Sequence, residues 1–271
     1  MIESQELWLL IPLLLVTGAF AGLLAGLLGV GGGIVIVPIL YHLFTAFGVE
    51  TALAMPLAVG TSLSTIVLTS IVSARKHYAK GGVDTALVRR WIVPVLIGVT
   101  IGAFAPAVID GAMVKTVFGV MLVLVSLHML ASSRWKIELF STLPPHAVQH
   151  LLAVMVGGLS ALLGIGGGTL MVPLLTLFAF PIHRAVSTAS VFGLIISVPA
   201  TLIYIGNGWD VAGLPRFSTG YVNWVAFAIL VPMTMWFAPL GVKLAYRLNV
   251  PQLKGVFAVF LCIIGIKMVL A

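Results

Sequence analysis

The stretch GVGGGIVIVP at residues 29–38 decides the architecture, because it returns 135 residues later as GIGGGTLMVP at residues 164–173. Further short matches keep the same order in both parts of the chain: AVGT at 58–61 with AVST at 185–188, FAP at 104–106 with FAP at 237–239, and KTVF at 115–118 with KGVF at 254–257. Ordered matches of this kind are typical of a duplicated unit. The sequence therefore predicts two membrane repeats, at residues 1–134 and 148–271, joined by a central loop at 135–147.

The composition places both repeats in a membrane. Hydrophobic residues make up 61% of the chain and charged residues 8%, which is more apolar surface than a soluble domain can bury. The net charge of +7 does not indicate a nucleic-acid partner, because the basic residues lie in short gaps between apolar runs, where they set topology. Eight apolar segments are long enough to span a bilayer: those near 7–28, 52–74, 91–109, 114–131, 148–163, 185–205, 222–240 and 252–270. We expect an all-α, multi-pass protein of the inner membrane, with the lipid bilayer as its surroundings.

Two further apolar segments, 34–47 and 169–181, each follow a glycine cluster and are short. About 14 helical residues reach ~20 Å, whereas the hydrocarbon core is ~30 Å thick. If these arms cross, each half has five crossings and the repeats are inverted; if they re-enter, the repeats are parallel. With the loop at 75–90 in the cytoplasm, the inverted arrangement puts eleven of the 14 basic residues inside and the parallel one nine. The positive-inside rule therefore favours inverted repeats, with about eight full spans plus two short arms.

The glycine clusters interrupt membrane helices, and such breaks survive only where the freed backbone groups face protein, water or ligand. The short helix after each break directs its N-terminal amides and its positive dipole end toward that break, which favours an anion. Two such ends can converge on one central substrate site. The glycines predicted to form this site are Gly31, Gly32 and Gly33 in the first repeat and Gly166, Gly167 and Gly168 in the second. The alternative is that the glycines only allow close helix packing.

Hydroxyl groups near the breaks can donate to anion oxygens without adding charge. The predicted substrate-binding hydroxyls are Thr61, Ser62, Thr169, Thr188 and Ser190. Each of them can instead bond to its own helix. The apolar runs hold no Asp or Glu, which argues against a cation pathway, and no His has metal-ligand spacing, so we expect no metal and no cofactor.

Three basic side chains are candidates for coupling or gating. His77 follows a cluster of cations at a helix end, His128 lies within an apolar run, and Arg184 precedes the helix that carries Thr188. A histidine here can relay a proton. The ordinary alternatives are an interfacial residue for His77 and Arg184, and a satisfied buried histidine for His128.

These motifs resemble the TauE/SafE sulfite exporter family, also called the toluene sulfonate uptake permeases, over nearly the whole chain. The resemblance rests on the two G-[VI]-GGG-x4-P arms, on AVGTS at 58–62 with its copy AVSTA at 185–189, and on His77 followed by GGVD at 81–84. It implies export or uptake of small sulfur-containing anions such as sulfite and organosulfonates. Members of the family differ in substrate, so the resemblance does not fix the anion.

Function classes other than transport fit the sequence less well. The apolar runs contain no nucleophile–base pair, metal cluster or paired carboxylates, so we do not expect an enzyme. We expect a secondary carrier that moves a small sulfur-containing or organic anion by alternating access. An anion channel stays open as the alternative, because the same arms could line a pore. A carrier saturates and shows counterflow, and a pore does neither.

Overall fold

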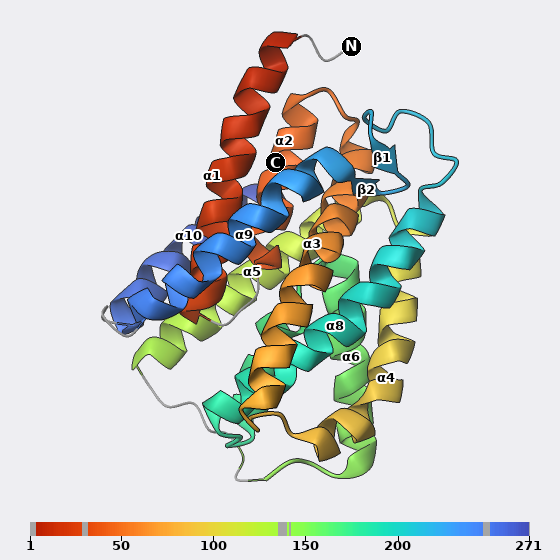
Figure 1. Cartoon of the computed structure of the whole chain (residues 1–271). Coiled ribbons are helices and arrows are strands. Elements are labelled where there is room, and N and C mark those ends of the chain that lie inside the picture. Colours follow the sequence, from red (N-terminus) through yellow and green to blue (C-terminus); the bar gives the residue numbers. More distant parts are fainter. Residues whose placement is uncertain (1–3, 29–31, 135–139, 141, 246–249, 271) are drawn as a thin grey trace.

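The computed structural model describes residues 4–28, 32–134, 140, 142–245 and 250–270, which form a bundle of helices (Figure 1). The first half contains α1 (Ser4–Leu28), α2 (Gly33–Ala46), α3 (Thr51–Ala79), α4 (Thr85–Phe104), the 3-10 turn η1 (Ala105–Ala107) and α5 (Gly111–Arg134). The second half contains α6 (His146–Leu163), α7 (Gly167–Leu177), α8 (Ile182–Asn207), the hairpin of β1 (Ser218–Thr219) and β2 (Val222–Asn223), α9 (Trp224–Ala245) and α10 (Val250–Leu270). The expected all-α class is confirmed. Gly31 and residues 135–139 and 141 of the predicted central loop lie outside the described residues.

The helices have the lengths that a membrane protein needs. Among the described residues, six helices are long and apolar enough to cross a bilayer: α3, α4, α5, α6, α8 and α9. Shorter apolar stretches are Ile11–Ala25, Gly33–Ala46, Gly167–Leu177 and Phe257–Leu270. The first and last of these lie in α1 and α10, and the other two are the expected short arms, α2 and α7. The protein is therefore an all-α multi-pass membrane protein, while about eight full spans stays a prediction.

The second glycine break has a defined backbone path. α6 ends at Leu163, and Gly164 follows with a φ of +66°, a left-handed conformation that suits glycine. The N–H groups of Gly164 and Ile165 both donate to the carbonyl oxygen of Ser160, which closes the end of α6. α7 then starts after Gly166, whose φ of −68° any residue can adopt. Among the described glycines of the two breaks, Gly164 is thus the position where backbone conformation requires glycine.

Each half packs its helices against those of the other half. α1 packs along α9, and α4 packs along α6. Glycines bring these backbones together: a methyl group on Gly22 would meet the backbone of Thr234, and one on Gly102 would meet the backbone of Gly158. α1 corresponds to α6 in the repeat, and α4 corresponds to α9. The α1–α9 and α4–α6 interfaces are therefore equivalent, since exchanging the two halves turns one into the other.

Two pairs of corresponding helices lie against each other, α3 with α8 and α5 with α10 (Figure 1). Contacts along the first pair run in opposite directions of numbering: Gly60 with Tyr204, Ser70 with Gly193, and His77 with Ser187. In the second pair, Gly119 lies beside Met268, and Val123 lies beside Gly265. Both pairs are therefore antiparallel. α3 is the most buried of the six long helices, so it forms the centre on which the other elements pack.

Candidate functional site

The two glycine breaks lie against each other, and both contact the middle of α3. A methyl group at Gly33 would lie 2.5 Å from the carbonyl oxygen of Gly164 and 3.1 Å from the Cα of Ile165. The side chain of Ile66 on α3 approaches both breaks, because it would contact a methyl group at Gly33 or at Gly166. Two segments separated by more than 100 residues thus meet at one level of the bundle.

The glycines of the breaks differ in the space around them. A methyl group at Gly167 would lie 2.9 Å from the backbone nitrogen of Gly193 and 3.0 Å from the carbonyl oxygen of Ala189, so α7 touches the backbone of α8 here. At Gly166 the nearest atom would be the Ile66 Cγ2 at 3.4 Å, and at Gly32 it would be a side-chain methyl at 3.2 Å. Close packing thus accounts for Gly33 and Gly167 and leaves Gly32 and Gly166 without that explanation. Gly168 lies in the first turn of α7.

Three of the predicted hydroxyls lie at or near the breaks. Ser62 is buried on α3 and donates to the carbonyl oxygen of Gly164 at 2.8 Å, which ties α3 to the second break. Thr169 is buried in the first turn of α7. Ser190 on α8 donates to the carbonyl oxygen of Ser187 in its own helix at 2.7 Å.

The predicted pair Thr61 and Thr188 makes matching contacts across the two halves. The Oγ1 of Thr61 accepts a 2.9 Å hydrogen bond from the N–H of Asn223, and the Oγ1 of Thr188 accepts one of the same length from the N–H of Asp84. Asn223 and Asp84 in turn cap the starts of α9 and α4, since their side chains accept from Ala226 N–H and Leu87 N–H. Each threonine therefore binds the helix cap of the opposite repeat.

The two threonines lie at opposite ends of the α3–α8 pair. Thr61 follows Gly60, which meets Tyr204, whereas Thr188 follows Ser187, which meets His77. Because α3 and α8 are antiparallel, the breaks lie between these two ends. The structure thus brings together the break glycines, Ser62 and Thr169. Thr61 lies next to Ser62 at one side of this group, and Thr188 lies toward His77 at the other side.

One end of the pair carries a charged and titratable cluster, which we call the His77 junction (His77, Asp84, Arg184, Ser187 and Thr188). Arg184 Nη2 lies 2.8 Å from Asp84 Oδ2, and Ser187 Oγ lies 2.9 Å from His77 Nδ1. Ser187 Oγ also donates to the carbonyl oxygen of His183 at 2.7 Å. Because a serine hydroxyl has one proton, His77 Nδ1 is the donor in its bond to Ser187.

The other end is the Tyr204 junction (Gly60, Thr61, Tyr204, Tyr221 and Asn223). The match of Thr61 with Thr188 puts Tyr204 at the position that corresponds to His77, and Gly60 at that of Ser187. Tyr204 is fully buried, and its hydroxyl donates to the carbonyl oxygen of Leu162 at 3.3 Å. The two ends thus have equivalent backbone contacts. Their side chains differ, because Tyr204 and Asn223 take the positions of His77 and Asp84.

Sequence reasoning missed the cap residues of these junctions. Asp84 ends GGVD at 81–84, and Asn223 ends GYVN at 220–223, so both repeats carry Gly-x-Val-[Asp/Asn] before a helix. Asp and Asn are preferred at helix N-caps, which is a signal that could have identified them. His128 lies near the end of α5, a helix that takes no part in either junction.

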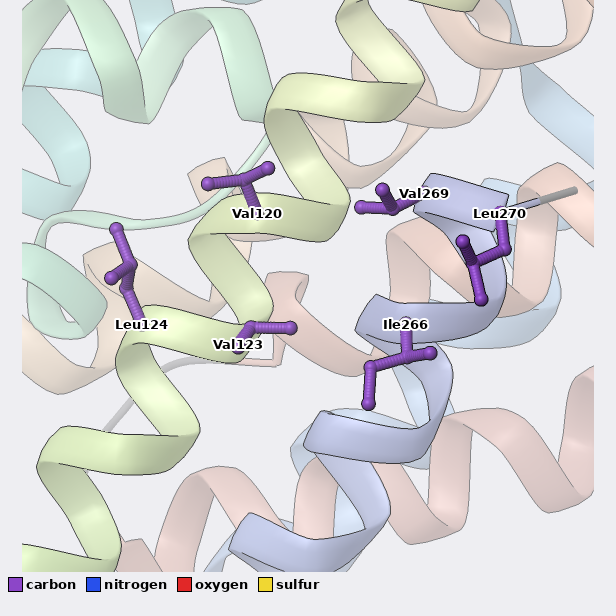
Figure 2. A pocket seen from close by; sticks show the side chains of 6 residues that line it. All are labelled: Val120, Val123, Leu124, Ile266, Val269 and Leu270. Atoms are coloured by element: carbon purple, nitrogen blue, oxygen red, sulfur yellow. The ribbon is translucent and has the colours of Figure 1, made fainter.

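The structure also has an apolar hollow between α5 and α10, and Figure 2 shows its lining. All six residues that line it are aliphatic: Val120, Val123, Leu124, Ile266, Val269 and Leu270. A hollow without polar groups offers nothing to orient an ion. Within the described ranges, no group of three or more His, Cys, Asp or Glu side chains could hold a metal ion.

Comparison with known proteins identifies relatives along the whole chain. The family model described as Sulfite exporter TauE/SafE matches residues 14–268. A probable membrane transporter protein of Haemophilus influenzae is 32% identical over 260 residues, covering 96% of this chain and 98% of the relative. One of Methanocaldococcus jannaschii is 30% identical over 267 residues, covering 98% and 97%. No solved structure matches.

Proposed function

Because the chain belongs to the sulfite exporter TauE/SafE family of membrane transporters, we propose that it is a secondary carrier for a small sulfur-containing or organic anion, such as sulfite or a sulfonate. The contact between the two glycine breaks at Ile66 carries this proposal. It provides a place in the middle of the bundle where a substrate can be reached alternately from the two ends of the α3–α8 pair.

An anion fits the chemistry of this place. The N–H groups of Val35 and Thr169 donate to the carbonyl oxygens of Gly32 and Gly166, so the amides that precede them in α2 and α7 are the ones left for a ligand. The positive ends of both helix dipoles lie at the breaks. Ser62 and Thr169 add hydroxyls at the same level. No carboxylate is present in either described break or in the turns that follow. We assign the break glycines and these hydroxyls as the substrate site, with Ser190 beside it and Thr61 and Thr188 along the path at its two ends.

Antiparallel pairing of corresponding helices supports inverted repeats. When an axis in the membrane plane relates two halves, each helix runs opposite to its counterpart; when the axis lies along the membrane normal, counterparts run the same way. α3 with α8 and α5 with α10 fit the first arrangement. Alternating access then follows as rocking of the halves, with the two junctions opening in turn.

Gating at the cytoplasmic side is assigned to the His77 junction. Opening that end requires α3 and α4 to separate from the start of α8, which breaks the Arg184–Asp84 ion pair and the His77–Ser187 hydrogen bond. Arg184 is about half exposed, with 54% of its side chain accessible, so water can solvate it once the pair opens. Salt weakens such an exposed pair, so the gate is easily opened.

Counterflow tests the carrier function against the channel alternative. Purified protein is reconstituted into proteoliposomes preloaded with unlabelled sulfite, and uptake of trace [35S]sulfite is followed. A carrier gives a transient accumulation above equilibrium and an initial rate that saturates with external sulfite. A rate that rises linearly with concentration, without accumulation, identifies a channel and refutes alternating access.

A further inference from the structure

Within the described residues, three buried hydroxyl oxygens have no hydrogen-bond partner, those of Ser160, Ser197 and Thr201. Ser160 and Ser197 are fully buried and Thr201 is 8% exposed. Native proteins bond nearly all buried polar groups, because a buried hydroxyl without a partner has lost its water and gained nothing in return. Three such groups therefore point to a partner that the described chain does not supply.

Ser160 belongs to the second glycine break. It lies in the last turn of α6, and its carbonyl oxygen is the acceptor for the N–H groups of Gly164 and Ile165. Its side-chain oxygen is thus one helical turn from the point where the backbone leaves α6 and starts toward α7. The short arm begins beside a hydroxyl that bonds to nothing in the described chain.

Ser197 and Thr201 lie on the face of α8 that looks toward the breaks. They share a stripe with Gly193 and Tyr204, since residues three or four apart in a helix point the same way. Gly193 packs on Gly167 of α7 and on Ser70 of α3, and Tyr204 bonds to the end of α6. The stripe therefore faces the start of α7, the middle of α3 and the end of α6.

The register of α3 and α8 fixes the positions of the Ser197 and Thr201 hydroxyls along this helix pair. Because Ser70 is opposite Gly193 and Gly60 is opposite Tyr204, Ser197 is level with Ile66 and Thr201 is level with Ser62. Ile66 is the residue that approaches both breaks, and Ser62 bonds to Gly164. The unpartnered hydroxyls are thus at the level where the breaks meet.

The repeat itself shows that the fold does not need these hydroxyls. By the matches between the breaks and between Thr61 and Thr188, Ser160 corresponds to Ala25, Thr201 to Ala74 and Ser197 to Ser70. The first repeat builds the same helices with alanine at two of the three positions. The hydroxyls at these two positions are therefore a special feature of the second repeat.

We propose that Ser160, Ser197 and Thr201 bind the oxygen atoms of the substrate, together with the first-turn amides of α7. This inference rests on the proposed carrier function and names the part of the substrate that is recognised: an oxyanion head group with three oxygens, as in sulfite or a sulfonate. Three hydroxyl donors match three acceptor oxygens, and a carboxylate, with two, leaves one hydroxyl unbonded.

Binding to the purified full-length protein in detergent tests the proposal, with sulfite, methanesulfonate and acetate as probes. We expect the wild type to bind sulfite and methanesulfonate more tightly than acetate. Ser160→Ala, Ser197→Ala and Thr201→Val should each weaken sulfite binding at least about tenfold, because each removes a bond to a charged group. Without ligand, their thermal unfolding midpoints should not fall, since no bond within the protein is lost.

Ser126→Ala is the matched control, because Ser126 is fully buried on α5 and its Oγ donates to Val123 O at 2.7 Å. It should lower the unfolding midpoint and leave sulfite binding unchanged. If all three site variants bind sulfite like the wild type, or if they lose stability as the control does, the hydroxyls are not the substrate site, while the carrier proposal stands. If the wild type binds none of the probes, the anion carrier proposal fails, and this inference fails with it.

Discussion

Adding one methyl group at Gly166, and comparing it with one at Gly167, separates a substrate site from a packing contact. Gly166→Ala meets ordinary space, with the nearest atom at 3.4 Å and a φ of −68° that alanine adopts without strain. Gly167→Ala directs its methyl group into the backbone of α8 at 2.9 Å from Gly193 N. Backbone atoms in a packed helix cannot move aside as a flexible side chain does, so the two neighbouring substitutions have different consequences.

The magnitudes follow from these distances. Overpacking costs about 1–3 kcal/mol, and the better helix propensity of alanine returns at most about 1 kcal/mol, so Gly167→Ala should lose up to about 2 kcal/mol of stability. Gly166→Ala should change stability by less than about 0.5 kcal/mol. Its methyl group stands at the break beside Ile66, however, where it competes with the anion for the amides of α7. We expect it to weaken sulfite binding about tenfold, or about 1.4 kcal/mol.

The assay is isothermal titration with sulfite alongside thermal unfolding of the same samples. Gly206→Ala on α8 is the control, because nothing lies within 4 Å of the added methyl group. Gly32→Ala, with its nearest contact a side-chain methyl at 3.2 Å, repeats the test at the first break. If Gly166→Ala and Gly32→Ala bind sulfite as the wild type does, the glycines serve helix packing and the central-site reasoning is refuted.

Three further predictions follow from the junctions and the arrangement of the halves. A thiol-reactive label that cannot cross the membrane should modify a cysteine placed at 206–215 from outside and one at 75–90 only from inside; labelling of both from one side would make the repeats parallel. Thr188→Val leaves the Asp84 N–H without its acceptor and should cost about 1 kcal/mol in thermal unfolding while slowing sulfite uptake, whereas unchanged uptake would remove Thr188 from the path. His77→Asn keeps a donor near the Nδ1 position and should keep transport, whereas His77→Leu should raise leak through the cytoplasmic end; equal transport in both variants would exclude a gate at His77.

The membrane class and the short arms could be predicted because both depend on local patterns in the sequence. Runs of apolar residues fix the helices, and the two glycine clusters mark the breaks wherever the helices later pack. The family resemblance had the same basis, since its motifs are contiguous in the chain. Such features need no knowledge of which helix lies beside which.

The partners of the predicted site residues could not be found in this way. Thr61 and Thr188 looked like a matched pair for one site, but their partners lie 162 and 104 residues away in the chain, at opposite ends of two antiparallel helices. A repeat places equivalent residues at equivalent positions of their helices. Because α3 and α8 are antiparallel, these positions lie far apart. The hydroxyls of Ser197 and Thr201 were also missed, because being buried without a partner is a property of the packed molecule and leaves no mark in the sequence.

The pairing of α1 with α9 and of α4 with α6 sets the order in which this protein can mature. When the first half leaves the ribosome and enters the membrane, α9, the partner of α1, has not yet been synthesised. Thr234, against which Gly22 packs, is therefore absent at that stage. α4 likewise has to wait for α6, against which it packs, and for Thr188 of α8, which accepts from the N–H of its cap residue Asp84. Until then the glycine faces of α1 and α4 are exposed to lipid or to other insertion intermediates. A fragment that stops before α6 should therefore be degraded, whereas the two halves made together as separate chains should assemble, since the long-range pairings, and not the central loop, hold them to each other.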